Sequence, residues 1–148
     1  MVDISQTFSE VGRLVAELHN HAANWQQPEG FRRHAWDVDG LTGEQPLWGR
    51  FWEFSGLNAV QRALLERARN TARDDLIAIG QPKESYGLIH SDLNLDNMLL
   101  YDGRVMAIDF DDCGFGWHLF DLATISILFR GTDDYDQIRQ ALIRGYRR

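Results

Sequence analysis

The segment HSDLNLDN at positions 90–97 gathers two aspartates, two asparagines and a histidine within eight residues. A short apolar run, Tyr86–Ile89, comes directly before it and is typical of a strand, so the polar segment is predicted to be a loop at the end of that strand. Carboxylate and amide oxygens are the ligands that Mg²⁺ takes from proteins, and a separate carboxylate can accept the proton of an attacking hydroxyl. These residue types therefore suit phosphoryl transfer.

A β-hairpin is predicted directly after this loop. Residues 97–101 and 104–110 are largely apolar, and only Asp102-Gly103 separates them. This dipeptide favours a two-residue turn in which both φ angles are positive. The two stretches are therefore expected to pair as antiparallel strands.

The predicted hairpin brings together side chains that are distant in sequence. Closing it places Asn97, at the start of the first strand, close to Asp109 at the end of the second. Asp92 precedes Asn97 by five residues on the same loop. Two carboxylates and an amide are therefore expected to converge on one small volume, which suits a hard cation.

The spacing of these residues matches a known pattern. His90, Asp92 and Asn97 form HxDxxxxN, which resembles the catalytic loop of the aminoglycoside phosphotransferase and choline kinase family, relatives of the protein kinases. The sequence IDF at 108–110 resembles the metal-binding Asp segment of that family, and FDLA at 120–123 resembles the DLA that follows it. A strand, a loop, a hairpin and a DLA segment thus occur in the order that the family shows.

The resemblance implies a role for each of five residues. Asp92 is the expected catalytic base, and Asn97 and Asp109 are the expected ligands of Mg²⁺ and, through it, of ATP. His90 is expected to support the loop by packing and hydrogen bonding, and Asp121 by hydrogen bonds to the loop backbone. From the residues alone, other roles stay open: Asp92 could make a turn hydrogen bond, and Asn97 and Asp109 could cap the hairpin ends.

The resemblance also implies the fold class, which is α+β. We expect one domain over residues 1–148, a mainly helical C-terminal lobe of a protein-kinase-like fold with a small antiparallel β-hairpin carrying the catalytic loop and metal site. The sole lysine, Lys83, lies in a linker, and no glycine-rich phosphate loop precedes it. We therefore expect that the N-terminal nucleotide lobe is absent from this chain and that its C-terminus is truncated. The surface left by the missing lobe is expected to lead to weak stability, to self-association or to the binding of a missing partner segment.

Hydrophobic periodicity predicts the helices around this centre. The first should begin near the Thr7–Glu10 capping-box spacing and reach about Asn20, with His19 and His21 as polar residues at its end. A long loop with scattered aromatic packing anchors should follow over 25–52.

Three further helices are predicted downstream of this loop. One should run from Asn58 to Gly80, with an apolar stripe on one face and arginines on a solvated face. A buried helix over 121–129 and a last helix capped by Thr132 should complete the chain.

Composition limits the classes of partner. The net charge is −7, with 15 Lys and Arg against 22 Asp and Glu, so a nucleic-acid-binding surface is not expected, and a cationic small substrate fits better. Asp96, Asp111 and Asp112 are candidates to add negative charge for a metal or such a substrate. The single cysteine, Cys113, excludes an internal disulfide, and residues 1–5 lack the features of an export signal. We expect a cytoplasmic protein without a membrane span.

These observations predict an ATP-dependent phosphotransferase that moves the γ-phosphoryl group to a hydroxyl of a small molecule. The acceptor stays open among aminoglycosides, choline-like amines, homoserine, sugars and protein hydroxyls. The alternative is a non-catalytic, kinase-derived binding or assembly module. The absence of the strand lysine and of the glycine-rich phosphate loop would favour this module if the chain were complete. A carboxylate metal hydrolase fits less well, because Asp92, Asn97 and Asp109 supply too few ligands for two metals.

Overall fold

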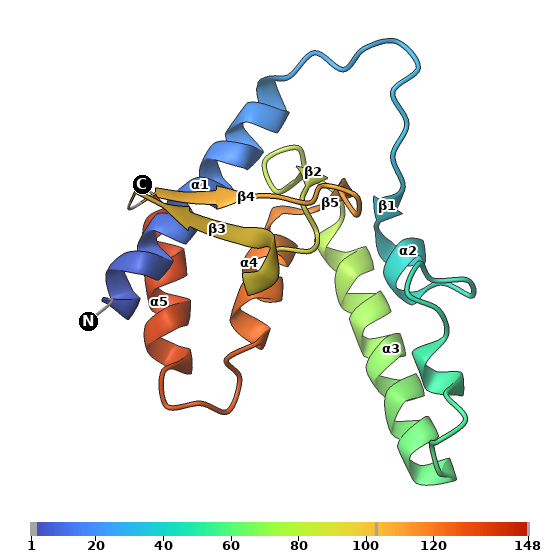
Figure 1. The fold of residues 1–148 in the computed structure, drawn as a ribbon. Coiled ribbons are helices and arrows are strands. Elements are labelled where there is room, and N and C mark those ends of the chain that lie inside the picture. Colours follow the sequence, from blue (N-terminus) through green and yellow to red (C-terminus); the bar gives the residue numbers. More distant parts are fainter. Residues whose placement is uncertain (1–2, 103, 148) are drawn as a thin grey trace.

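Helices from the two ends of the chain form the body of the protein. The computed structural model describes residues 3–102 and 104–147. In it, α1 (Ile4–Asn24) lies beside α5 (Tyr135–Tyr146), and α4 (His118–Ile127) packs against both (Figure 1). Their facing sides bury an apolar cluster, which consists of Phe8, Val11, Val15, Leu93, Leu122, Ile125, Ile138, Ala141 and Leu142.

Two glycines let the backbones of α1 and α5 approach closely. A side chain at Gly12 would clash with the carbonyl of Leu142, and one at Gly145 would clash with the carbonyl of Ser9. The first helix also begins earlier and ends later than predicted. Asp3 caps it by accepting a hydrogen bond from the backbone N–H of Gln6, so the Thr7–Glu10 spacing lies inside the helix.

The strands form two small sheets, which confirms the α+β class. In the first, β5 (Gly114–Trp117) lies between β1 (Ala35–Trp36), which is parallel to it, and β2 (Tyr86–Ile89), which is antiparallel. The second is the predicted hairpin of β3 (Met98–Tyr101) and β4 (Arg104–Ala107).

As predicted, the catalytic loop begins at the end of β2 and runs into the hairpin, and β2 itself belongs to the three-stranded sheet. The turn residue Asp102 has a φ of 48°, as the predicted turn requires, whereas Gly103 lies outside the described residues.

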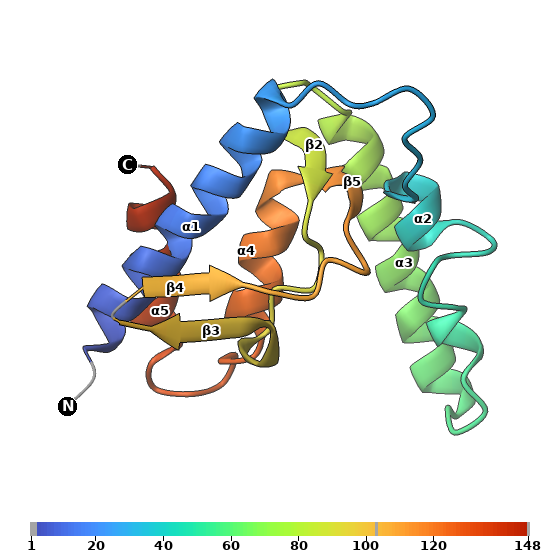
Figure 2. The same cartoon turned by 45° about the horizontal axis from the view of Figure 1, so that its top comes forward.

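A separate arm, residues 37–80, extends away from the body (Figures 1 and 2). It consists of α2 (Val38–Thr42), the 3₁₀ helix η1 (Phe51–Glu53) and α3 (Ala59–Ile79). As predicted, α3 begins with a capping box of Asn58 and Gln61 and ends at Gly80. The prediction of one long loop over 25–52 was wrong, because this region contains β1, α2 and the start of η1.

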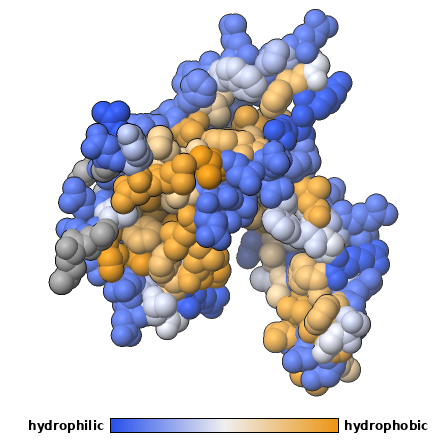
Figure 3. All heavy atoms as spheres, in the orientation of Figure 1, coloured by the Kyte–Doolittle hydropathy of each residue, from blue (hydrophilic) through white to orange (hydrophobic). Residues whose placement is uncertain are grey.

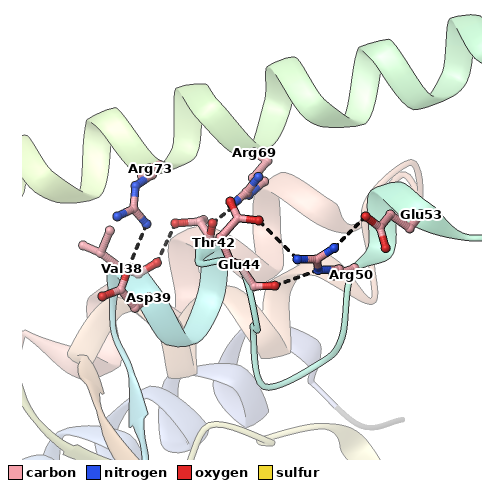
Figure 4. A network of polar contacts seen from close by, with 8 residues as sticks. All are labelled: Val38, Asp39, Thr42, Glu44, Arg50, Glu53, Arg69 and Arg73. Carbon is pink, nitrogen blue, oxygen red and sulfur yellow. Dashed lines mark hydrogen bonds and ion pairs between the residues drawn. The ribbon is translucent and has the colours of Figure 1, made fainter.

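The arm is held by arginines instead of an apolar stripe. Arg69 donates to the Thr42 carbonyl and to Glu44, both at 2.7 Å, and Arg73 pairs with Asp39 at 3.0 Å (Figure 4). Throughout the described chain no residue of α3 is buried, and its apolar Leu64 is 55% exposed. The prediction of a solvated arginine face was therefore wrong for Arg69 and Arg73, whose guanidinium groups form the contact with α2, whereas Arg67 is exposed as predicted.

The hairpin and α4 each expose a group of apolar side chains. On the hairpin they are Leu99, Leu100, Tyr101 and Met106, and on α4 they are Leu119 and Ile127. Figure 3 shows apolar atoms over these regions and the molecule hollowed between α4 and α3. The prediction that the helix after Asp121 is buried on all sides was wrong, because Asp121, Leu122 and Ile125 face the core while the opposite face is exposed.

The last helix also begins without the predicted cap. The Thr132 hydroxyl donates to the Phe129 carbonyl, and Asp134 occupies the N-cap position without a side-chain hydrogen bond. No helix in the described ranges is both long enough and apolar enough to cross a membrane.

Candidate active site

The predicted catalytic loop is tied at its start to a buried carboxylate. Asp121 is fully buried on α4 and accepts hydrogen bonds from the backbone N–H groups of His90, at 3.1 Å, and Ser91, at 2.7 Å. Ser91 has a φ of 70°, in the left-handed region that costs a non-glycine residue about 1–2 kcal/mol. Two charge-assisted hydrogen bonds can offset this strain, and Leu93 anchors the loop in the apolar core.

His90 links the loop to the segment before Asp109. Its Nε2–H donates to the carbonyl of Ile108 at 2.9 Å, and its ring packs against Phe110 with centroids 4.6 Å apart. Because a carbonyl can only accept, the proton lies on Nε2. The other ring nitrogen, Nδ1, is buried without a hydrogen-bond partner among the described residues. These contacts are those of the support role expected for His90.

Asp92 and Asn97 are in direct contact. The Asn97 side-chain amide donates to Asp92 Oδ2 at 2.8 Å and to the Asp92 carbonyl at 2.9 Å. Asn94 donates to the other carboxylate oxygen, Oδ1, at 3.1 Å. The Asp92 carboxylate is therefore oriented by two amides. Since Asn97 uses its NH₂ group in this way, its Oδ1 is the atom left to bind a cation.

Asp109 lies next to Asn97 across the hairpin. The N–H of Ile108 donates to the Asn97 carbonyl at 3.0 Å, and Asp109 follows directly. Asp109 has a φ of 63° and an exposed side chain, whose Oδ1 accepts from the described residues only a long contact of 3.4 Å, which the Asp111 N–H donates. Its carboxylate thus keeps most of its lone pairs for a ligand. The predicted contact of Asp92 with Asn97 is present and Asp109 directly follows the residue bonded to Asn97, while the convergence of its carboxylate with theirs stays a prediction.

The donor set fits a hard divalent cation that shares its coordination with phosphates and water. Asn97 Oδ1 and the Asp109 carboxylate are oxygen donors of the type Mg²⁺ takes, one or two per protein site. In residues 3–102 and 104–147, no three His, Cys, Asp or Glu side chains gather closely enough to form a metal site on their own. Any cation here would therefore depend on non-protein ligands.

His19 is a site residue that the sequence interpretation missed. Its Nε2–H donates to Asp121 Oδ2 at 2.9 Å, and its Nδ1 accepts from the Tyr146 hydroxyl at 2.8 Å. The prediction of a polar residue at a helix end was wrong, since His19 is buried and only His21 is exposed. The signal was available, because Val11, Val15 and His19 are spaced four residues apart and share the apolar face of α1.

The surroundings of this buried network shift two pKa values. Burial lowers the pKa of His118 below its ordinary 6.5, and the neighbouring His19, stacked at 4.5 Å, lowers it further. Burial and then the charge of Asp121 raise the pKa of Tyr146, so its hydroxyl stays protonated and can donate to His19. Both shifts favour neutral rings around the Asp121 carboxylate.

Cys113 and the additional carboxylates lie outside this network. Burial raises the pKa of the Cys113 thiol, which makes it a poor nucleophile. Asp96 and Asp111 are exposed, and Asp112 is half-buried. Asp111 and Asp112 follow Asp109 closely in the chain, and Asp96 directly precedes Asn97.

The sequence matches the model of the phosphotransferase enzyme family over residues 3–148. The chain belongs to this family. Amicoumacin kinase of Bacillus subtilis (strain 168) is 25% identical over 132 residues, which are 87% of this chain and 36% of that protein. The predicted family relationship is thus confirmed, and with it the assignment to phosphotransferases at the level of the family.

Solved structures of two kinases are similar to this one. A microcompartment-associated aminopropanol kinase has a TM-score of 0.86 and 37% identity, covering 97% of this chain and 45% of that one. An amicoumacin kinase, hAmiN, in complex with AMP-PNP, Ca²⁺ and Ami has a TM-score of 0.74 at 22% identity, covering 97% of this chain and 43% of that one. The chain therefore spans less than half the length of each of these relatives, and the second likeness concerns the fold.

Proposed function

We propose that this chain is the catalytic lobe of an ATP-dependent kinase that transfers the γ-phosphoryl group to a hydroxyl of a small, amine-bearing alcohol. One observation carries the proposal. Asp92 and Asn97 are hydrogen-bonded to each other on a loop whose backbone is held by the buried Asp121. A carboxylate held in one orientation beside a free amide oxygen is what a base next to a metal ligand requires.

In this proposal Asp92 accepts the proton of the acceptor hydroxyl. Its two carboxylate oxygens each receive one amide N–H, which leaves lone pairs for a hydroxyl donor and prevents rotation of the group. Holding the base in place supplies part of the orientation that phosphoryl transfer depends on. His90 and Asp121 act through the loop and do not touch the acceptor.

Asn97 and Asp109 are the residues that hold the divalent cation, taken here to be Mg²⁺ bound with ATP. When bound, such a cation neutralises charge on the phosphate oxygens. The fit of the two oxygen donors supports this role, and so does the binding of AMP-PNP and Ca²⁺ by a kinase of similar fold. Asp109 is exposed, as a residue that meets a nucleotide must be.

The acceptor class follows from charge and from one relative. The chain carries a net charge of −7, and Asp96 and Asp111 are exposed close to the predicted base and metal ligand. Carboxylates near a reacting hydroxyl favour a substrate that carries an ammonium group. The similar structure at 37% identity is that of an aminopropanol kinase, which supports an amino alcohol as the first acceptor to test.

Asp92→Asn in the complete gene product tests the base, with Asp96→Asn as the matched control on the same loop. Replacing a general base should lower kcat about 10²–10⁴-fold while nucleotide affinity stays near that of the wild type. Asp96→Asn should leave kcat near that of the wild type, because Asp96 is not the base, and should raise only the KM for an amine-bearing acceptor. Equal turnover of Asp92→Asn and wild type would exclude Asp92 as the base.

Calorimetric titration with Mg²⁺ and ATP, together with a phosphorylation assay, separates this proposal from the non-catalytic alternative. We expect binding that depends on Mg²⁺ and that Asp109→Ala weakens. If the complete gene product bound nucleotide but phosphorylated no amino alcohol, sugar or peptide hydroxyl, the binding-module interpretation would replace the kinase.

A further inference from the structure

Asp109 itself is weakly held by its own contacts. Its φ of 63° lies in the left-handed region, its side chain is exposed, and its one described hydrogen bond is 3.4 Å long. A residue in such a conformation persists only when its surroundings determine it. The position of Asp109 must therefore be set by the backbone on either side of it.

On one side, that backbone is gripped by three side chains from a distant segment. Arg33 donates to the carbonyls of Asp111, at 3.0 Å, and Phe110, at 3.4 Å. His34 Nε2–H and Trp36 Nε1–H both donate to the Asp112 carbonyl, at 3.0 and 2.9 Å. Three consecutive carbonyls after Asp109 thus receive four donors from residues 33–36.

We propose that Arg33, His34 and Trp36, here called the β1 clamp, are positioning residues that hold Asp109 in its metal-binding place. The proposal rests on the proposed function in assigning a cation to Asp109. The clamp residues themselves do not touch the cation. They act on the carbonyls of residues 110–112, which follow the ligand directly in the chain.

The β1 clamp is anchored through His34 and Trp36. Trp36 is 3% exposed, and β1 pairs with β5 directly after the clamped loop, where the Phe115 N–H donates to the His34 carbonyl at 3.0 Å. A side chain at Gly114 would meet that carbonyl at 2.8 Å, so glycine allows the close approach. Ser91 of the catalytic loop also donates to the Asp112 carbonyl, at 2.6 Å.

The clamp joins the predicted metal site to the arm. Asp37, next to Trp36, caps α2 by accepting from the N–H groups of Asp39 and Gly40. Arg73 then ties Asp39 to α3 at 3.0 Å (Figure 4). One continuous segment therefore contacts α3 at one end and the backbone after Asp109 at the other.

The test compares Arg33→Met with Arg32→Met in the complete gene product. Both arginines are exposed and adjacent, and both changes remove one positive charge, but only Arg33 binds the carbonyls of Phe110 and Asp111. Mn²⁺ binding is measured by paramagnetic resonance with a non-hydrolysable ATP analogue. Partners of metal ligands typically affect metal affinity by 10–100-fold, so Arg33→Met should raise the Kd for Mn²⁺ about tenfold.

Amide hydrogen exchange supplies a readout that needs neither metal nor turnover. Arg33→Met should accelerate exchange in residues 110–113, and Trp36→Phe, which removes only the N–H donor from an aromatic ring, should do the same. Arg32→Met should change neither exchange nor the Kd for Mn²⁺. Equal behaviour of the two arginine variants would overturn the clamp. Where Asp109→Ala weakens Mn²⁺ binding, faster exchange in Arg33→Met with unchanged Mn²⁺ affinity would overturn it too.

Asp109→Ala, measured alongside, separates the two proposals. If Mn²⁺ binding survived that change, the metal site of the proposed function would fall. Exchange in residues 110–113 would then decide whether the clamp holds this backbone. Faster exchange in Arg33→Met but not in Arg32→Met would support it, and equal exchange in the two variants would overturn it.

Discussion

In the body of the protein, α1 and α5 meet through apolar side chains and two glycines, whereas in the arm α3 meets α2 through the guanidinium groups of Arg69 and Arg73. Both α1 and α3 are 21 residues long and amphipathic. Yet α1 buries Val11, Val15 and His19, while no residue of α3 is buried in the described chain.

The difference between the two regions shows what an amphipathic pattern can and cannot decide. A stripe at helical spacing predicts a helix, but it is buried only where another apolar surface meets it. In the arm, α2 and the residues after it offer carbonyls and carboxylates to α3, and Trp52 offers an aromatic ring, all of which suit arginine. We therefore expect core substitutions to unfold the protein and arm substitutions to act locally.

The largest effect is expected in the body. Ile125→Ala on α4 truncates a side chain that is 0% exposed. Replacing a buried isoleucine by alanine leaves a cavity and lowers the free energy of unfolding by about 2–5 kcal/mol. Ile127→Ala on the same helix is the control, because Ile127 is 53% exposed. Chemical denaturation of both variants measures the contrast. Similar midpoints for the two would contradict the assigned core.

A smaller, local effect is expected for Arg69→Met in the arm. The variant keeps the aliphatic stem near Trp52 but loses donors to the Thr42 carbonyl and Glu44. We expect the arm to lose about 1–2 kcal/mol of local stability. This loss should appear as faster hydrogen exchange in α2 and α3, with little change in the body. Arg67→Met, an exposed arginine on the same helix, is the control. A global loss of stability equal to that of Ile125→Ala would remove the distinction between the regions.

The buried network of the body should make its stability depend on pH. The pKa of His118 is lowered by burial and by His19, while Asp121 opposes the shift, so folding favours the neutral ring. The resulting stability is present above the ordinary pKa of 6.5 and is lost as pH falls through the lower folded value. Melting temperatures between about pH 8 and 5 measure this slope. His118→Gln should flatten it, and an unchanged slope would assign the effect to other groups.

The smallest effect is expected for Leu64→Ala on the apolar stripe of α3. Leu64 is 55% exposed, and surface substitutions usually change stability by less than about 0.5 kcal/mol. Thermal unfolding of the complete gene product, with and without the substitution, measures this change in stability. A loss of stability above about 2 kcal/mol would show that the apolar stripe of α3 is covered in the complete gene product, and the contrast between body and arm would then not hold.

Elements governed by neighbours in sequence could be predicted. The strand Tyr86–Ile89, the hairpin register and the capping box at Asn58 all depend on residues a few positions apart. The same holds for the convergence of Asp92 with Asn97. The strands β1 and β5 could not be predicted in this way, because Ala35–Trp36 is too short and Gly114–Trp117 too rich in glycine to show alternation.

The sequence by itself determined the family and the α+β class, because residue types at fixed short spacings carry that information, and it predicts the roles proposed for the loop residues. Only the tertiary structure decided that His19 binds Asp121 and that Arg33, His34 and Trp36 hold the backbone after Asp109. These partners lie far apart in the chain, 102 residues in the first case. Whether a polar side chain binds across such a distance depends on which elements pack together, and local pattern does not record that packing.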